Sequence, residues 1–154
     1  ELPAVFTSTT GHVLFTDDTD ANGVAMPAQN AGGVAWVNVF GLSNYATRYS
    51  PAFVYYTNLY GYAPYVAEAG SHEFGHNVGL SHDGLTDGTP YYTGHGSGLV
   101  DWSPIMGNSY QRNLTQWSKG EYSGANQRQD DVAIIAGSGN GDVGTVIETQ
   151  GDAV

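Results

Sequence analysis

Residues 72–82 read HEFGHNVGLSH and place three histidines at spacings that suit a metal site. His72 and His76 are four residues apart, so on a helix their imidazoles leave the same face, one turn apart. Two imidazoles in that arrangement can bind one tetrahedral zinc ion. Gly79 permits a sharp turn after the helix, and this turn is expected to bring His82 back as a third ligand.

Three protein ligands leave the fourth zinc position open for water, which is typical of a catalytic site. Glu73 directly follows a ligand and can act as a general base toward that water. The alternative interpretation is two surface histidines on an amphipathic helix and an unrelated histidine in a loop. The full pattern HExxHxxGxxH, with its glycine at the predicted end of a helix, favours the metal site.

A helix from Pro64 to Gly79 is predicted to carry the motif. Proline suits the first turn of a helix, and glycine suits the left-handed residue that ends one. Apolar or small residues recur at every fourth position of this segment, namely Val66, Gly70, Phe74 and Val78. This periodicity predicts a buried stripe along the helix.

Upstream of the helix, runs rich in β-branched and aromatic residues predict strands at Val13–Thr16, Gly33–Phe40 and Ala52–Thr57. Downstream, the segment from Ser81 to Asn113 consists almost entirely of turn-forming residues. Irregular stretches of that length in a compact domain are usually functional.

A second helical region is predicted near the end of the chain. Ser118 followed by Glu121 has the spacing of a capping box, which predicts a helical region that continues through Asp131–Ile135. The Gly-rich residues 137–154 are predicted to be a frayed tail or a linker. The whole chain of 154 residues suits one domain with a single core.

Composition excludes several classes of partner. The chain has 4 Lys and Arg against 15 Asp and Glu, and its formal net charge is −11. Such a surface repels nucleic acid and anionic membranes. The absence of cysteine excludes disulfides, thiolate ligands and a cysteine nucleophile. No apolar run approaches the roughly 20 residues that span a bilayer.

The low share of charged residues, 12%, together with 22 glycines and 11 tyrosines, suits a loop-rich exported protein. The chain opens with Glu1-Leu2-Pro3 and has no signal peptide, so we expect a mature or excised domain that is secreted.

With Asp83, the motif reads HEFGHNVGLSHD and resembles that of the metzincin metallopeptidases, above all their adamalysin (reprolysin)-like branch. Ser103–Gly107, SPIMG, resembles the Met-turn that lies beneath the zinc in that clan. GGVAWVNVF followed by PAFVYYTNL resembles the strand pair before the zinc helix. NLTQWSKGEY is similar to the segment after the Met-turn in bacterial secreted members. The resemblance covers roughly residues 12–136.

The resemblance implies an α/β (α+β) zincin catalytic domain. Its twisted mixed sheet lies over the zinc-binding helix, and an irregular lower subdomain with the Met-turn is closed by a C-terminal helix. Met106 is then a hydrophobic floor and not a ligand, because a thioether matches three imidazoles and water poorly. The resemblance also implies that Gly107, Asn108 and Ser109 shape the pocket for the residue that follows the cut.

Three features depart from the family pattern. Animal adamalysin-like domains carry disulfides, so a chain without cysteine indicates a bacterial or simplified relative. Few residues precede the first predicted strand, so the N-terminal part of the fold is expected to be missing or replaced by a shorter segment. Some metzincins have a tyrosine two residues after the Met-turn methionine, where this chain has Asn108. Tyr110 is not assigned as a ligand.

Substrate is predicted to bind as an added strand along Ala52, Phe53, Val54 and Tyr55. In the resembling family a strand at this position lies at the sheet edge beside the metal. The unpaired N–H and C=O groups of an edge strand can pair with an extended peptide.

Three other features stay open from the residues alone. Asp18–Gly23 matches the first half of a calcium loop, but its twelfth position is Gln29, so an ordinary turn is the competing interpretation. Asp83 is either an acceptor that orients a ligand imidazole or a structural turn residue. His95 is the nearest spare histidine and would be needed as a fourth ligand if the zinc were structural.

We therefore predict a monomeric zinc-dependent endopeptidase that acts on proteins or peptides. The metal ligands are His72, His76 and His82, and Glu73 is the general base. The alternative function is a catalytically weak metzincin-like module that binds extracellular protein without cleaving it. The intact Glu73 argues against that alternative, because a binding module has no need of a base there.

Overall fold

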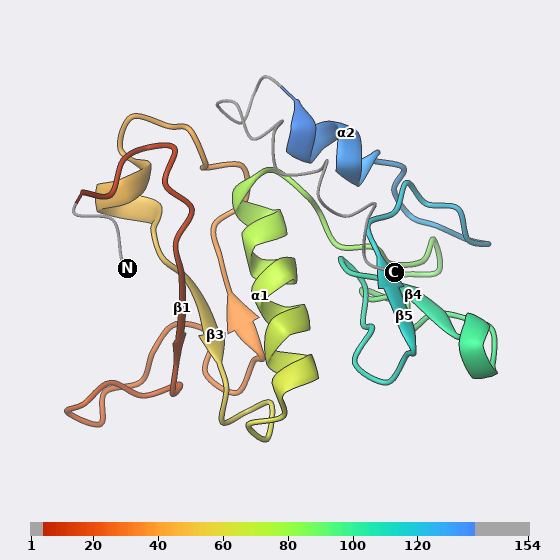
Figure 1. Cartoon of the computed structure of the whole chain (residues 1–154), viewed down its shortest axis with the longest axis horizontal. Coiled ribbons are helices and arrows are strands. Elements are labelled where there is room, and N and C mark those ends of the chain that lie inside the picture. The colour runs from red at the N-terminus through yellow and green to blue at the C-terminus, as the bar shows by residue number, and fades with distance from the viewer. Residues whose placement is uncertain (1–4, 138–154) are drawn as a thin grey trace.

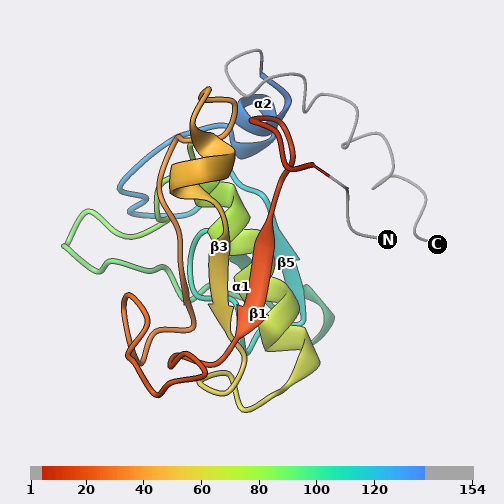
Figure 2. The same ribbon diagram turned by 90° about the vertical axis from the view of Figure 1, so that its left-hand side faces the viewer.

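The computed structural model describes residues 5–137, in which one long helix lies between two small sheets (Figures 1 and 2). The elements follow the order β1 (Val13–Thr16), β2 (Gly33–Val34), a π-helical turn η1 (Tyr45–Tyr49), β3 (Ala52–Tyr55), α1 (Ala63–Asn77), a 3₁₀ turn η2 (Gly98–Val100), β4 (Trp102–Pro104), β5 (Leu114–Gln116) and α2 (Asp131–Ala136). Within these residues no helix combines the length and the apolar character needed to cross a membrane.

The first sheet is mixed and has the order β1-β3-β2. β1 is parallel to β3, with Val13 opposite Ala52, and β2 is antiparallel to β3, with Gly33 opposite Val54. The N–H of Ala52 donates to the His12 carbonyl on the β1 side. The N–H groups of β3 therefore alternate between its two neighbours.

The prediction that Ala52–Thr57 is an edge strand is wrong. β3 is the central strand, and all four of its residues, Ala52, Phe53, Val54 and Tyr55, are paired with β1. On the other side the N–H of Tyr55 donates to the carbonyl of Gly32. Strand order depends on contacts between segments far apart in the chain, and local apolar character does not reveal it.

The strand prediction for Gly33–Phe40 is correct only over Gly33–Val34. Beyond this short strand the N–H groups of residues 38–40 donate to the carbonyls of His76 and Asn77. The last carbonyls of a helix have no partner within it. The chain therefore leaves the sheet early because its backbone is needed to complete the end of α1.

Helix α1 runs close to its predicted bounds. Pro64 lies in its first turn, and the helix ends two residues before Gly79, whose φ is +109°. One side of α1 packs on β3, where Ala69 joins the buried Val54 and Leu59. The other side faces the lower part of the chain, as Figure 1 shows. The helix is thus held from two sides.

The lower part is irregular, as predicted, and is organised around one buried cluster. β4 and β5 pair in parallel, with Trp102 opposite Leu114. Buried apolar side chains from both sides of α1 meet beneath its C-terminal half: Val39, Phe40, Tyr45, Val78, Leu80 and Met106. This cluster is the main core of the described residues.

The predicted C-terminal helical region is shorter than expected. α2 begins only at Asp131, and its N-cap is Asp130, whose side chain accepts from the N–H of Ala133. Ser118 does not open a helix. Its hydroxyl donates to the buried Asp83 instead, so a tertiary contact uses the group that the capping box would have used. Of the predicted tail 137–154, only Gly137 is among the described residues.

Candidate active site

Three imidazoles converge on one point beside the C-terminal half of α1. His72 and His76 project from consecutive turns of the helix, and His82 comes from the segment that follows it. One ring nitrogen from each lies within 4.8 Å of the others. The Nε2 atoms of His76 and His82 are 2.9 Å apart. The predicted ligands are therefore brought together. Among the described residues they form the group of His, Cys, Asp or Glu side chains that could hold a metal ion.

Backbone carbonyls orient two of the rings. The Nδ1 of His72 lies 2.8 Å from the carbonyl oxygen of Ile105, and the Nδ1 of His76 lies 2.8 Å from that of Leu80. A carbonyl oxygen only accepts, so each Nδ1 carries the proton and each Nε2 presents a lone pair to the shared point.

Burial keeps these imidazoles neutral. Loss of solvent lowers the pKa of His72 to about 3 and that of His82 to about 4, and it lowers the pKa of His76 as well. Neutral imidazole is the form that binds metal. Three neutral nitrogen donors, two of them oriented by carbonyls, fit a zinc ion.

The return of His82 depends on Gly79. With φ at +109°, Gly79 occupies backbone space that residues with a Cβ rarely adopt. The N–H of Gly79 donates to the carbonyl of His76, and the N–H of Leu80 donates to that of Gly75. These two bonds close the helix and reverse the chain, so that His82 arrives beside the ring of His76.

Glu73 lies next to the histidines, under the edge of the sheet. It is only 7% exposed, and burial raises the pKa of its carboxyl to about 8. A Cβ on Gly33 would lie 2.8 Å from the Oε1 atom of Glu73. Glycine at this point of β2 therefore leaves room for the carboxylate between the sheet and the metal site.

Met106 lies beneath the helix at the level of the ligands. Its side chain is fully buried, and its Sδ atom would be 2.7 Å from a Cβ on Gly75, so the sulfur rests directly on the helix backbone. The neighbouring Ile105 supplies the carbonyl that orients His72. Met106 thus packs against the helix that carries two of the predicted ligands.

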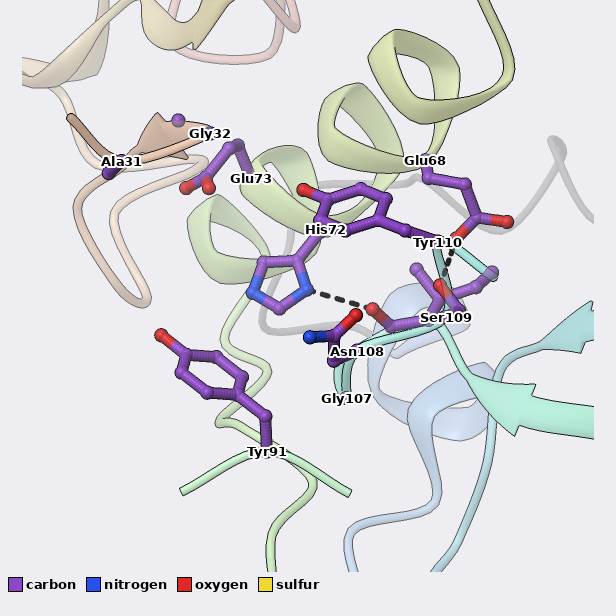
Figure 3. Close-up of a pocket in the computed structure, with 12 residues that line it drawn as sticks. Ala31, Gly32, Glu68, His72, Glu73, Tyr91, Gly107, Asn108, Ser109 and Tyr110 are labelled. Atoms are coloured by element: carbon purple, nitrogen blue, oxygen red, sulfur yellow. Dashed lines mark hydrogen bonds between the residues drawn. The ribbon is translucent and has the colours of Figure 1, made fainter. Parts of the chain in front are cut away.

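A cavity of about 240 Å³ opens beside His72 and Glu73 (Figure 3). The three residues predicted to shape a substrate pocket all line it. Its described lining consists of Ala31, Gly32, Gly33, Glu68, His72, Glu73, Tyr91, Ile105, Gly107, Asn108, Ser109 and Tyr110. None of the four β3 residues proposed as substrate-binding lines this cavity.

Glu68 and Tyr91 are among the lining residues that the sequence analysis did not assign to the site. Glu68 precedes His72 by four positions, so the same helical spacing that joins the histidines places it on their face, and this signal was readable. Tyr91 comes from the irregular segment and packs its ring 4.4 Å from that of His82. No local pattern marks it, because only the fold of that segment brings it to the site.

Asp83 and His95, whose roles the sequence left open, form hydrogen bonds with residues other than the three converging histidines. The carboxylate of Asp83 accepts from Ser118, Tyr122 and Gln127, and none of these is a ligand histidine, which favours the structural interpretation. His95 Nδ1 lies 2.9 Å from the hydroxyl of Tyr92, and His95 is outside the group of converging imidazoles.

In the segment Asp18–Gly23, which matches half of a calcium loop, one carboxylate oxygen of Asp20 accepts from the N–H groups of Asn22 and Val24, each at 2.8 Å. These bonds describe a turn stabilised by its own aspartate. They support the ordinary-turn interpretation of Asp18–Gly23.

A mixed sheet packed on a helix that carries two of three converging imidazoles, above a buried methionine, defines a metzincin-like catalytic domain. The model for Metallo-peptidase family M12B Reprolysin-like matches residues 2–116, and the chain belongs to this family. No match was found among curated proteins or among solved structures.

Proposed function

We propose that this protein is a zinc-dependent endopeptidase that hydrolyses internal peptide bonds of proteins. The observation that carries the proposal is the convergence of His72, His76 and His82 within 4.8 Å, next to the buried Glu73. Membership of a metallopeptidase family supports the same reaction. The metal implied is zinc, because the donors are three neutral imidazoles and no thiolate.

A zinc ion at this site supplies Lewis acidity, which polarises a carbonyl and makes water more acidic. The chain's own contribution begins with the carbonyls of Ile105 and Leu80, which hold two imidazoles with Nε2 facing inward. A zinc ion bound beside Glu73 would favour the ionised form of its carboxyl against the effect of burial, and this carboxylate would take a proton from the attacking water and later pass it to the leaving amine. Glu73 lies under β2 and would be beside a peptide bound along the sheet edge.

The free edge of β2 is the proposed place for the substrate backbone, in place of β3. Because the carbonyl of Gly32 accepts from Tyr55, the alternation of an antiparallel pair directs the N–H and C=O of Gly33 to the open side. An extended peptide can pair with these groups. A peptide bound there would pass Glu73, which lies against Gly33.

The experiment that tests this function compares wild type, Glu73→Gln and a matched control, Glu121→Gln. Glu121 is exposed and, within residues 5–137, accepts a hydrogen bond from the N–H of Lys119 and does not line the cavity, so its substitution changes the charge equally without touching the site. Zinc content and cleavage of unfolded casein are measured with and without chelator. We expect all three proteins to bind zinc and Glu73→Gln to lose about 10²–10⁴-fold in activity.

If wild type binds zinc but cleaves neither casein nor itself at high concentration, the non-catalytic binding module becomes the better proposal. If Glu73→Gln keeps full activity, Glu73 is not the base.

We also propose that the protein acts outside the cell. Support comes from composition alone, since the chain has few charged residues and many glycines and tyrosines. Detection of the protein in the supernatant of intact cells would support secretion. Its retention inside those cells would contradict it.

A further inference from the structure

The cavity beside the histidines has an acidic end that the reaction described above does not use. Glu68 lies one turn before His72 on α1, which is about 6 Å along the helix axis. Figure 3 shows its carboxylate on the far side of Tyr110 from Tyr91. The only charged side chains among the described lining residues are Glu68 and Glu73, and both are acidic.

A hydrogen bond holds the Glu68 carboxylate in place. The hydroxyl of Ser109, which is only 4% exposed, donates to Oε2 of Glu68. A serine hydroxyl satisfies one acceptor site, and a carboxylate offers about four. Among residues 5–137 this carboxylate accepts no other hydrogen bond, so Oε1 is available to a donor that enters the cavity.

No basic side chain of the protein neutralises this charge. Arg112, three residues after Ser109, forms an ion pair with Asp101 and donates to the carbonyl of Thr93. The other three are occupied at other places: Arg48 over the ring of Tyr49, Lys119 against Asp130 and Arg128 at the carbonyl of Gly120. Every Lys and Arg in the sequence is thereby accounted for.

We propose that Glu68 is a specificity-determining residue and that the cavity takes a lysine or arginine side chain from the residue directly after the cleaved bond. This inference rests on the proposed function and names its substrate class. A cationic side chain gains most where a fixed carboxylate lies in partly desolvated surroundings. The ring of Tyr110, which lies between His72 and Glu68 in Figure 3, suits the apolar stem of such a side chain.

The spacing of the residues fits this assignment. The scissile bond must lie near His72 and Glu73, and Glu68 precedes His72 by about one helical turn on α1. The flexible four-carbon stem of lysine can bridge that separation with its ammonium at the acidic end. A neutral side chain of the same length fills the space and leaves Glu68 without a charged partner.

The test uses three quenched fluorescent peptides that differ only at the residue after the cut, which is lysine, norleucine or glutamate. Wild type is expected to have a kcat/KM for the lysine peptide at least tenfold above that for the norleucine peptide, and the glutamate peptide is expected to be the poorest. In Glu68→Gln the ratio of kcat/KM for the lysine peptide to kcat/KM for the norleucine peptide is expected to fall toward one. Glu121→Gln, which removes the same charge elsewhere, is expected to keep the wild-type ratio.

A second measurement is independent of turnover. Binding of product-like peptides with N-terminal lysine or norleucine is measured by calorimetry in the same variants. A Glu68-dependent preference in binding without any cleavage overturns the proposed function, and with it the assignment to the residue after a cleaved bond, and supports only the cation site at Glu68. The inference is overturned if the protein cleaves the peptides but Glu68→Gln changes neither the kcat/KM ratio of the lysine and norleucine peptides nor the preference in binding. The proposed peptidase function stands in that case.

Discussion

Replacing Met106 by alanine is expected to destabilise the protein and to weaken its metal site together. The side chain is fully buried beneath Gly75 and packs with Leu80 and Val78. The change removes three heavy atoms, each worth about 0.8 kcal/mol as a buried methylene. A term for the cavity left behind adds to this. We therefore expect a loss of about 3–4 kcal/mol in the free energy of unfolding.

A loss of this size is large against the roughly 5–15 kcal/mol that stabilises a typical domain. The metal site should respond as well, because Ile105 next to Met106 holds Nδ1 of His72. Loss of such an orienting contact typically lowers metal affinity about 10–100-fold. Urea unfolding of the chelated protein gives the first quantity, and competition with a fluorescent zinc indicator gives the second.

Two control variants test whether the effect depends on the side-chain volume at position 106 and on the burial of the methionine that is replaced. Met106→Leu keeps the volume and should lose less than about 1.5 kcal/mol. The chain's other methionine, Met26, is only partly buried, so Met26→Ala should lose much less than Met106→Ala. A Met106→Ala protein within about 0.5 kcal/mol of wild type, with unchanged zinc affinity, would refute the view that this side chain supports the ligand helix.

Three further predictions concern single sites. His82→Ala should lower zinc affinity by more than 100-fold, beyond the range for losing an orienting partner, and normal zinc content would place the third ligand elsewhere. Val54→Pro and Tyr55→Pro should both prevent folding, since β3 is paired on both sides; a folded variant by circular dichroism would contradict this strand order. Burial raises the pKa of Asp131 from 3.8 to about 7. The protonated form is thus favoured in the folded state, and stability should fall as pH rises from about 4 to 7. In Asp131→Asn the free energy of unfolding, measured with urea, should decrease less over this pH range. An unchanged decrease would mean that other groups cause it.

The zinc motif was readable from the sequence because its geometry is local. Four-residue spacing on a helix places His72 and His76 together whatever surrounds them. A glycine at the helix end lets the chain return within a few residues, so His82 also follows from short-range rules. Glu68 obeys the same spacing, and its placement was open to the same reasoning.

Strand order was not readable, because it is settled by pairing between distant segments. β3 is rich in β-prone residues whether it lies at an edge or in the centre of the sheet. β3 is the central strand because residues 13–16 pair with it on one side and residues 33–34 on the other. The early end of β2 has the same origin, since residues 38–40 bond to the end of α1.

The sequence by itself thus determined the metal-binding helix, its end at Gly79 and the irregular course that follows, all through contacts within a few residues. Tertiary structure alone decided which strand edge is open, what the carboxylate of Asp83 binds and that Tyr91 lies beside His82. Tyr91 comes from a segment without periodicity, and its neighbour Tyr92 stacks on the ring of Tyr122. Contacts of this kind between distant segments have no signature along the chain.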